Sequence, residues 1–423
     1  MADATTAPLP DEITIGRAQA ILKIQIQQDQ PVLLIGPPGL GKSAIVAHFV
    51  KEHNAGFSAR VSAELATKKA KDLPPNGGLV TTEELEVDGF YYDMIDLRLG
   101  QMDVPDLRGL PILQGEQTLE TRPHWFPEEE TRTVTLSGPA GDQKVRAPIQ
   151  TLVFLDEITS AVPVMQAAAY QIVLERKIGQ WALPKGTRVL AAGNRLEDNA
   201  VVFSMSSALR SRFSILNVRL DQSAWDTWAM LNGIDERVLA YIRHKPDMLA
   251  DYTQLQQQSY PCPRTWEMLS RSLGALPHAT DEETIDTMSI LAGSVVGQGA
   301  SLDFTTYIRT WQDLPDIDAL LEGRIRYEIS DDPSQVDIGV VFALTTAVAM
   351  RAAPRYRGKY TEAIFKFAND LPTHLAEFRV RVGRDAIALN RDILSMVFNA
   401  TDKPNVGSWF AELGNQVSLI DAA

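Results

Sequence analysis

The chain contains the sequence Gly36-Pro37-Pro38-Gly39-Leu40-Gly41-Lys42-Ser43 between an apolar run at residues 31–35 and a stretch of helical periodicity at residues 43–51. It matches G-x-x-x-x-G-K-S without a gap, in the strand, loop and helix order that this phosphate-binding motif needs. The glycines let backbone N–H groups point at phosphate oxygens, and the N-terminus of the following helix adds the positive end of its dipole. Lys42 would contact the β- and γ-phosphates of ATP, and the Ser43 hydroxyl would ligate Mg²⁺. The alternative, a glycine-rich turn with an incidental lysine, leaves the flanking strand and helix unexplained.

Two further apolar runs, residues 151–155 and 188–192, are also followed by polar residues and helical stretches. Strands that alternate with helices predict an α/β fold with a parallel sheet. About residues 55–150 are rich in Pro, Gly and charge, and we expect much of this stretch to be an insertion with an exposed hairpin or loop near its end. Beyond about residue 220 helical periodicity continues, with a further division expected near residue 331.

The second and third strands end in polar side chains, at the edge where open α/β sheets bind their ligands. Asp156 and Glu157 follow residues 151–155, and Asn194 follows the third strand. Asp156 is expected to be a partner of the Mg²⁺ that Ser43 ligates, and Glu157 to polarise a water for attack on the γ-phosphate. Asn194 would bond the γ-phosphate or orient that water. Solvated carboxylates and a turn asparagine are the alternatives, and the order after the phosphate loop disfavours them.

Arginines follow at two later points of the chain. Arg210 and Arg212 stand two residues apart near the end of a helical pattern, and one of them is a candidate for supplying charge to a γ-phosphate across a subunit boundary. The residues do not decide which one, and a purely structural role for both stays open because paired surface arginines are common. Arg264 stands at the start of a later helix, where Pro263 suits the first turn. By spacing alone this is an ordinary helix start.

The composition bounds where the protein works and what it binds. Fifty-four acidic and forty basic residues give a formal net charge of −14, which on average repels nucleic acid. The single cysteine, Cys262, cannot form an internal disulfide, as suits the reducing cytosol. The first residues lack the features of a secretory or transit peptide. The apolar stretch at residues 338–350 is too short to span a membrane and is expected to be a core helix. We therefore expect a cytoplasmic protein with no membrane span.

Five segments, in the order GPPGLGKS, LVFLDE, AAGN, ALRSRF and PCPRTW, resemble the AAA+ superfamily of ATPases and, within it, the MoxR-like family. The resemblance covers about residues 12–325. It implies a P-loop AAA+ α/β ATP-binding domain in residues 1–220 and an all-α lid domain in residues 221–330. Residues 331–423, like the long stretch before Asp156, match nothing in the family's pattern and are expected to form a helical C-terminal extension.

The resemblance also implies a role for each motif. It places Walker A at residues 36–43, Walker B at Asp156 and Glu157, sensor 1 at Asn194, an arginine finger at Arg210 or Arg212, and a nucleotide-contacting sensor 2 at Arg264. It implies ATP and Mg²⁺ as cofactors and a homo-oligomeric ring, expected to be a hexamer. MoxR-like proteins, to which the CbbQ-type Rubisco activases are related, remodel or activate protein partners. Many of these partners carry a von Willebrand factor A domain.

Two tryptophans, Trp125 and Trp181, lie where such rings present loops to their substrates. A pore-facing role is one interpretation. The other, favoured because large aromatic side chains are mostly buried for packing, is that each tryptophan anchors its loop on the domain.

Two other functions compete with protein remodelling. A nucleic-acid motor or helicase-loader-like protein is the main alternative, since relatives in the same clade move DNA with similar hairpins. The acidic balance and the absence of a recognisable zinc, helix-turn-helix or aromatic-basic module disfavour it. A P-loop kinase of small molecules would need neither paired finger arginines nor a helical lid that carries Arg264.

Overall fold

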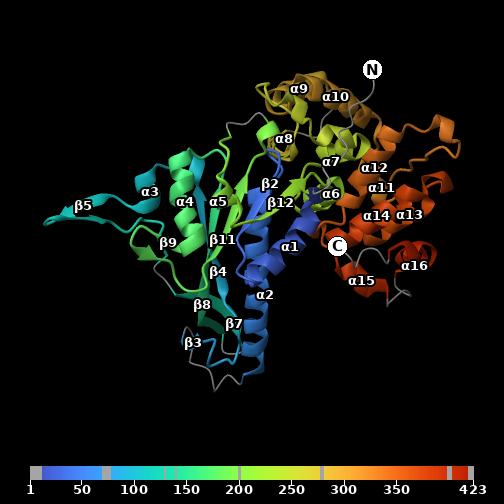
Figure 1. Ribbon diagram of the computed structural model, residues 1–423. Helices are drawn as coiled ribbons and strands as arrows, with labels where there is room; N and C mark the ends of the chain where they lie inside the picture. Colours follow the sequence, from blue (N-terminus) through green and yellow to red (C-terminus); the bar gives the residue numbers. More distant parts are fainter. Residues whose placement is uncertain are drawn as a thin grey trace. The chain divides into compact units, whose positions relative to one another are not determined.

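The computed structural model describes residues 12–68, 78–127, 130–138, 141–198, 202–276, 281–397 and 403–417 (Figure 1). The chain divides into two compact units, Met1–Asp221 and Gln222–Ala423. Within the described residues, no helix is both long and apolar enough to cross a bilayer.

The first unit is built on a parallel sheet in the order β1-β12-β2-β11-β8, with β4 on the far side of β8. Neighbouring strands in this sheet are distant in the sequence, so each connection crosses over through other elements. The strands of this central sheet are β1 (Glu12–Thr14), β2 (Val32–Ile35), β4 (Tyr91–Arg98), β8 (Gly141–Asp156), β11 (Arg188–Gly193) and β12 (Ser214–Arg219).

Helices cover both faces of this sheet, which explains why its inner strands are continuous apolar runs. Val32 and Leu34 of β2 pack in one core with α1 (Ile15–Gln27) and α2 (Lys42–Thr67). Leu33, between them, points into the opposite core with α4 (Pro163–Glu175). The alternation of side chains along a strand thus divides one apolar run between two layers.

The stretch at residues 55–150, expected to be largely insertion, contributes to the core of the unit. The helix after the phosphate loop does not end near residue 51 but continues to Thr67, and β4 is a strand of the central sheet. The second half of α2 packs through Phe57, Val61 and Leu65 against β3 (Leu79–Thr81) and the first half of β8. That first half pairs with β3 on one side and antiparallel with β7 (Thr131–Gly138) on the other.

The other short elements of the first unit form hairpins and single turns of helix. Between β4 and β8, α3 (Val104–Arg108) leads to the antiparallel pair β5 (Pro111–Gln114) and β6 (Gln117–Glu120), which projects from the unit (Figure 1). The expected hairpin near the end of the stretch is therefore present twice, as β5–β6 and as β7–β8. A smaller hairpin, β9 (Lys177–Ile178) and β10 (Trp181–Ala182), precedes β11, and α5 (Ser207–Arg210) precedes β12.

The described part of the second unit is helical. Residues 221–330 and 331–423, expected as two domains, lie within this one compact unit, and α7 packs against α12. The apolar stretch at residues 338–350 is the core helix that the sequence predicts, α12. The helices are α6 (Gln222–Leu231), α7 (Glu236–His244), α8 (Pro263–Leu273), α9 (Glu282–Val296), α10 (Gln298–Arg309), α11 (Ile317–Leu321), α12 (Ile338–Met350), α13 (Thr361–Asp370), α14 (Ala376–Leu389), α15 (Asp392–Val397) and α16 (Pro404–Val417).

The C-terminal helix α16 is part of the core of the second unit. Trp409 is fully buried, and its indole N–H donates to the carbonyl of Arg379 on α14 at 2.9 Å. A Cβ atom at Gly383 would lie 2.2 Å from the Trp409 ring, so only glycine lets α14 approach this closely. The predicted fold class, an α/β core with a parallel sheet followed by C-terminal helices, is confirmed.

Candidate active site

The phosphate loop is shaped by glycines that no other residue could replace without strain. β2 ends at Ile35, and α2 begins at Lys42. Gly39 and Gly41 have φ angles of 74° and 99°, in the left-handed region that favours glycine. At Gly36 a Cβ atom would lie 2.5 Å from the carbonyl oxygen of Val218 on β12. The Gly36 N–H donates to the Gly193 carbonyl at 3.3 Å, which ties the loop to the end of β11.

Lys42 lies over this loop. It is 8% exposed, and its ammonium donates to the carbonyls of Gly36 at 2.7 Å and Pro37 at 2.9 Å. It also donates to the side-chain oxygen of Asn194 at 2.9 Å, across 152 positions of sequence. These three acceptors are neutral oxygens. Phosphate oxygens, which are charged, would form stronger hydrogen bonds with the same ammonium.

Ser43 and Asp156 form the candidate magnesium site. The Ser43 hydroxyl donates to Oδ2 of Asp156 at 2.6 Å, across 113 positions of sequence. The two residues come from the first turn of α2 and the last position of β8. A hydroxyl and a carboxylate are the hard oxygen ligands that Mg²⁺ prefers, and Mg²⁺ usually takes one or two protein groups together with phosphate oxygens. The residues therefore fit the ion that the motif implies.

The backbone turns sharply after β8 and separates two adjacent carboxylates. Glu157 has a φ of 55°, an uncommon conformation for a residue with a side chain and one that costs about 1–2 kcal/mol. Its N–H donates to Oδ1 of Asp156 at 2.9 Å, and its carbonyl accepts from the Ser160 N–H at 2.9 Å, so the turn is held on both sides. A Cβ atom at Gly100 would lie 2.9 Å from Oε2 of Glu157. Asp156 can thus serve the ion while Glu157 points elsewhere.

Asn194 is positioned by Thr159, a residue whose role the sequence does not reveal. The Asn194 N–H donates to the Thr159 hydroxyl at 2.8 Å. A Cβ atom at Gly193 would lie 2.5 Å from the Thr159 side chain, which explains the glycine before the asparagine. Thr159 stands two residues after Glu157, in the turn that follows β8. The ends of β8 and β11 are therefore linked through one threonine.

A third carboxylate, Asp96 on β4, shares this edge of the sheet and is absent from the sequence predictions. β4 runs parallel to β8, with Asp96 opposite Phe154 and Arg98 opposite Asp156. Partial burial raises the pKa of Asp96, and the negative charge of Asp156 raises it further, whereas Arg98 acts in the other direction. The available signal was weak, because only the last three residues, Asp96, Leu97 and Arg98, alternate between exposed and buried positions.

The two finger candidates are presented to solvent by a helical turn. Leu209 and Phe213 are buried in the core at 2% and 7% exposure, and they hold the segment against the unit. Arg210 and Arg212, which lie between them in the sequence, are exposed. Neither arginine forms an ion pair with another described residue. The structure brings neither side chain to Lys42 or Asp156 within the described part of this chain.

Arg264 lies in the second unit, at the second position of α8. Pro263 occupies the first helical position, as the sequence predicts, and Trp266 fixes the helix through a fully buried ring. The Arg264 side chain is exposed. Its role at a nucleotide stays a prediction.

The two tryptophans act as anchors. Trp125 is 8% exposed, packs in the core beneath α4, and donates its indole N–H to the Leu107 carbonyl at 3.1 Å. Trp181 is half-buried, with the Arg122 guanidinium 4.8 Å from its ring centre. Both contacts fit the anchoring interpretation.

Comparison with known proteins yields structures but no sequence family. No protein-family model matches the chain, and no curated protein matches it. A RuvB mutant from Thermotoga maritima is similar at 13% identity, over 75% of this chain and 78% of its own, with a TM-score of 0.31. NtrX from Brucella abortus in complex with ATP is similar at 12% identity, over 86% of this chain and 68% of its own, also with a TM-score of 0.31. At TM-scores this low the likeness says nothing about what this chain does.

Proposed function

We propose that this chain binds ATP with Mg²⁺ and hydrolyses it, as an AAA+ ATPase of the MoxR-like family. One observation carries the proposal: the hydrogen bonds from Lys42 to Asn194 and from Ser43 to Asp156 join the ends of three parallel strands. The carboxyl ends of strands in an open α/β sheet are where ligands bind. The residues that phosphoryl transfer requires thus come together at a single edge.

Each side chain at this edge has a distinct task in the proposed reaction. The loop N–H groups and Lys42 bind the phosphates, and Ser43 and Asp156 hold Mg²⁺, which neutralises charge on the phosphate oxygens. Glu157 accepts a proton from the attacking water, and Asn194 orients that water or the γ-phosphate. Two observations support this division: Asp156 accepts the hydrogen bond from Ser43, whereas the carboxylate of Glu157 lies beside Gly100.

No described hydrogen bond or ion pair joins Arg210 or Arg212 to Lys42 or Asp156, and this motivates assembly. Arg210 and Arg212 are exposed and form no ion pair with a described residue, so either can reach a neighbouring copy of the chain. We propose a homo-oligomeric ring, a hexamer by resemblance, in which one of them completes the neighbour's site. Arg264 would contact the same nucleotide from the helical unit.

The proposed output is remodelling or activation of a protein partner in the cytoplasm. By resemblance, a protein with a von Willebrand factor A domain is the first partner to test. The net charge of −14 supports a protein over a nucleic acid, because phosphate polymers are repelled on average.

A nucleic-acid motor is the second candidate. No recognisable aromatic-basic module supports it, but the short segment 351–360 carries Arg351, Arg355, Arg357 and Lys359 together with two tyrosines. Arg351 and Lys359 are engaged in ion pairs with carboxylates. Arg355 and Arg357 are exposed and pair with no described carboxylate. Proteins that hold duplex DNA firmly make roughly 6–10 phosphate contacts, so this segment alone is a weak basis for a motor.

The experiment that tests the proposal uses the Glu157→Gln variant, which should bind ATP and stop before hydrolysis. The purified variant with ATP is used to capture partners from an extract, and the Lys42→Ala variant serves as the control that cannot hold nucleotide. A protein that is retained only by Glu157→Gln, and only with ATP, supports remodelling. The captured protein must then also change the ATP turnover of the parent chain. Nuclease-sensitive nucleic acid in its place promotes the second candidate. A chain that neither binds nor hydrolyses ATP overturns both.

A further inference from the structure

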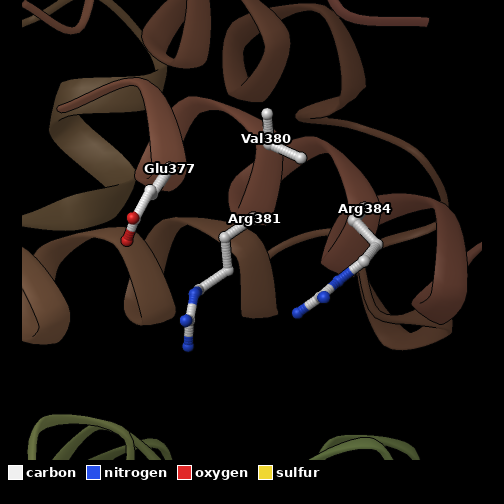
Figure 2. A pocket seen from close by; sticks show the side chains of 4 residues that line it. All are labelled: Glu377, Val380, Arg381 and Arg384. Carbon is white, nitrogen blue, oxygen red and sulfur yellow. The ribbon is translucent and has the colours of Figure 1, made fainter. Parts of the chain in front are cut away.

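A small hollow on helix α14 gathers unusual charge. Glu377, Val380, Arg381 and Arg384 line a space of about 280 Å³ (Figure 2). Residues three or four apart on a helix are neighbours on one face, and Glu377, Arg381 and Arg384 follow one another at spacings of four and three. Figure 2 shows the side chains of Glu377, Arg381 and Arg384 extending to the same side of the helix. The hollow is smaller than a typical drug-sized pocket and suits a single small group.

Arg381 is a half-buried cation that no carboxylate holds. Its guanidinium lies 5.4 Å from the ring centre of Phe342, and it forms no ion pair with another described residue. Burial lowers the pKa of Arg381, and the positive charge of Arg243 nearby lowers it further. Both effects mean that its charge is less well stabilised here than in water.

The nearest carboxylates are already engaged by another arginine. Arg243, with a side chain 3% exposed, pairs with Asp226 at 2.6 Å and with Asp385 at 2.8 Å. Arg384 reaches Asp385 only at 3.5 Å, at the limit of a hydrogen bond. The partly buried Asp226 and the buried Asp385 are therefore engaged first by Arg243, and Arg384 contacts Asp385 only weakly.

Glu377, the acidic residue that lines the hollow, does not neutralise the positive charge of Arg381. Glu377 precedes Arg381 by four positions, the favourable order for a helical ion pair, yet no pair within 4.0 Å forms between them. Two arginines three positions apart repel each other unless an anion lies between them. Two neighbouring arginines without a carboxylate between them favour the binding of an anion.

We propose that this hollow binds one phosphate group, with Arg381 and Arg384 as its donors. A guanidinium presents paired N–H groups that match phosphate oxygens, and a tetrahedral phosphate can serve two guanidiniums at once. A phosphate monoester carries more than one negative charge near pH 7, whereas a ligand carboxylate carries one and must compete with the tethered Glu377. The group is inorganic phosphate or the terminal phosphate of a small monoester. This site is in the second unit and does not depend on ATP hydrolysis at the phosphate loop.

The test is calorimetric titration of the full chain carrying Lys42→Ala, which weakens phosphate binding at the loop. Inorganic phosphate should bind saturably, and Arg381→Gln and Arg384→Gln should each weaken it by roughly tenfold or more, because each removes a charge-assisted contact. Glu377→Gln should tighten binding, since it removes a competing negative charge. The matched control is Arg326→Gln, an exposed arginine of the same unit with no ion pair among described residues, which should change nothing.

Adenosine monophosphate, titrated in a second arm, distinguishes the two sources. Binding of both ligands with the same sensitivity to Arg384→Gln assigns the site to a monoester, and binding of inorganic phosphate alone assigns it to the free ion. Arg384 is exposed, so its variant folds even where Arg381→Gln perturbs packing, and circular dichroism checks this. Equal affinity in the parent and in Arg384→Gln overturns the proposal. An equal loss of phosphate affinity in Arg326→Gln would also overturn the proposal, because it would indicate diffuse charge attraction.

Discussion

Two buried cations, Lys42 in the first unit and Arg243 in the second, differ in the hydrogen-bond acceptors that the structure describes around them. Three acceptors around Lys42 are neutral oxygens, two from the loop backbone and one from Asn194. Arg243 is held by the carboxylates of Asp226 and Asp385. Burial acts to lower the pKa of Arg243, yet these two charges raise it above its ordinary value.

The difference separates a binding site from a structural network. A phosphate can replace the neutral acceptors of Lys42 and gain a charge-assisted bond. A ligand that displaced a carboxylate from Arg243 would leave a buried charge unpaired, at a cost of several kcal/mol. The first arrangement is therefore suited to exchange, and the second to holding α6, α7 and α14 together.

The largest effect expected is at the exchangeable site. Lys42→Ala should abolish detectable ATP affinity, whereas Glu157→Gln should keep the affinity and lose hydrolysis by roughly a hundredfold or more, because phosphate binding and water activation are separate tasks. A fluorescent nucleotide measures binding, and phosphate release measures turnover. Parental turnover in Glu157→Gln would show that the Walker B assignment is wrong.

The second largest effect is expected at Arg243, where a substitution should lower the stability of the protein. Arg243→Ala leaves the buried Asp385 and the partly buried Asp226 without their partner, so the free energy of unfolding should fall by about 3–5 kcal/mol in urea titrations followed by tryptophan fluorescence. Arg355→Ala, an exposed arginine without a described ion pair, is the control and should change it by no more than about 0.5 kcal/mol. If the two variants unfold alike, the network around Arg243 is not what stabilises this unit.

A third prediction tests whether a second subunit completes the nucleotide site around Lys42. A subunit with Arg210→Ala and Arg212→Ala, mixed equally with a Lys42→Ala subunit, should recover roughly a quarter of parental hydrolysis, since one interface in four then combines an intact loop with intact arginines. Each variant alone should be inactive. No recovery despite demonstrated co-assembly counts against a shared site.

A smaller effect is expected where one hydrogen bond positions Asn194. Thr159→Val removes the acceptor of the Asn194 N–H, which is worth about 1–1.5 kcal/mol, so ATP turnover should fall by roughly fivefold to tenfold. ATP affinity should change far less, because Lys42 and the loop remain. Thr159→Ser keeps the hydroxyl and is the matched control. If serine and valine behave alike, the hydroxyl does not position the asparagine.

Added nucleic acid is expected to have no effect on ATP turnover. Single-stranded or duplex nucleic acid added at low salt, where phosphate contacts are strongest, should leave ATP turnover unchanged. Arg355→Gln with Arg357→Gln tests the basic segment directly. Stimulation that fades as salt rises and disappears in this variant would replace protein remodelling with the nucleic-acid motor.

The sheet was predictable only in part, for a reason visible in β2 and β4. Residues 31–35 form an unbroken apolar run because helices cover both faces of the sheet at β2. β4 pairs with β8 alone in the central sheet, and its apolar residues are interrupted by the charged residues Asp93 and Asp96. A search for apolar runs therefore finds β2, β8 and β11 and misses β4, the edge strand that carries Asp96.

The site shows the same division. The phosphate loop is determined by the sequence itself, because its glycine dihedrals, its lysine and the helix start all lie within eight consecutive positions. The sequence also determines that Asp156 and Asn194 end apolar strands. Only the tertiary structure decided that Lys42 bonds Asn194, that Ser43 bonds Asp156 and that Thr159 positions Asn194. Such contacts depend on which strands are neighbours in the sheet. Strand order is set by the crossover connections and by the burial of both faces of the sheet over the whole unit. No local stretch of residues contains that information.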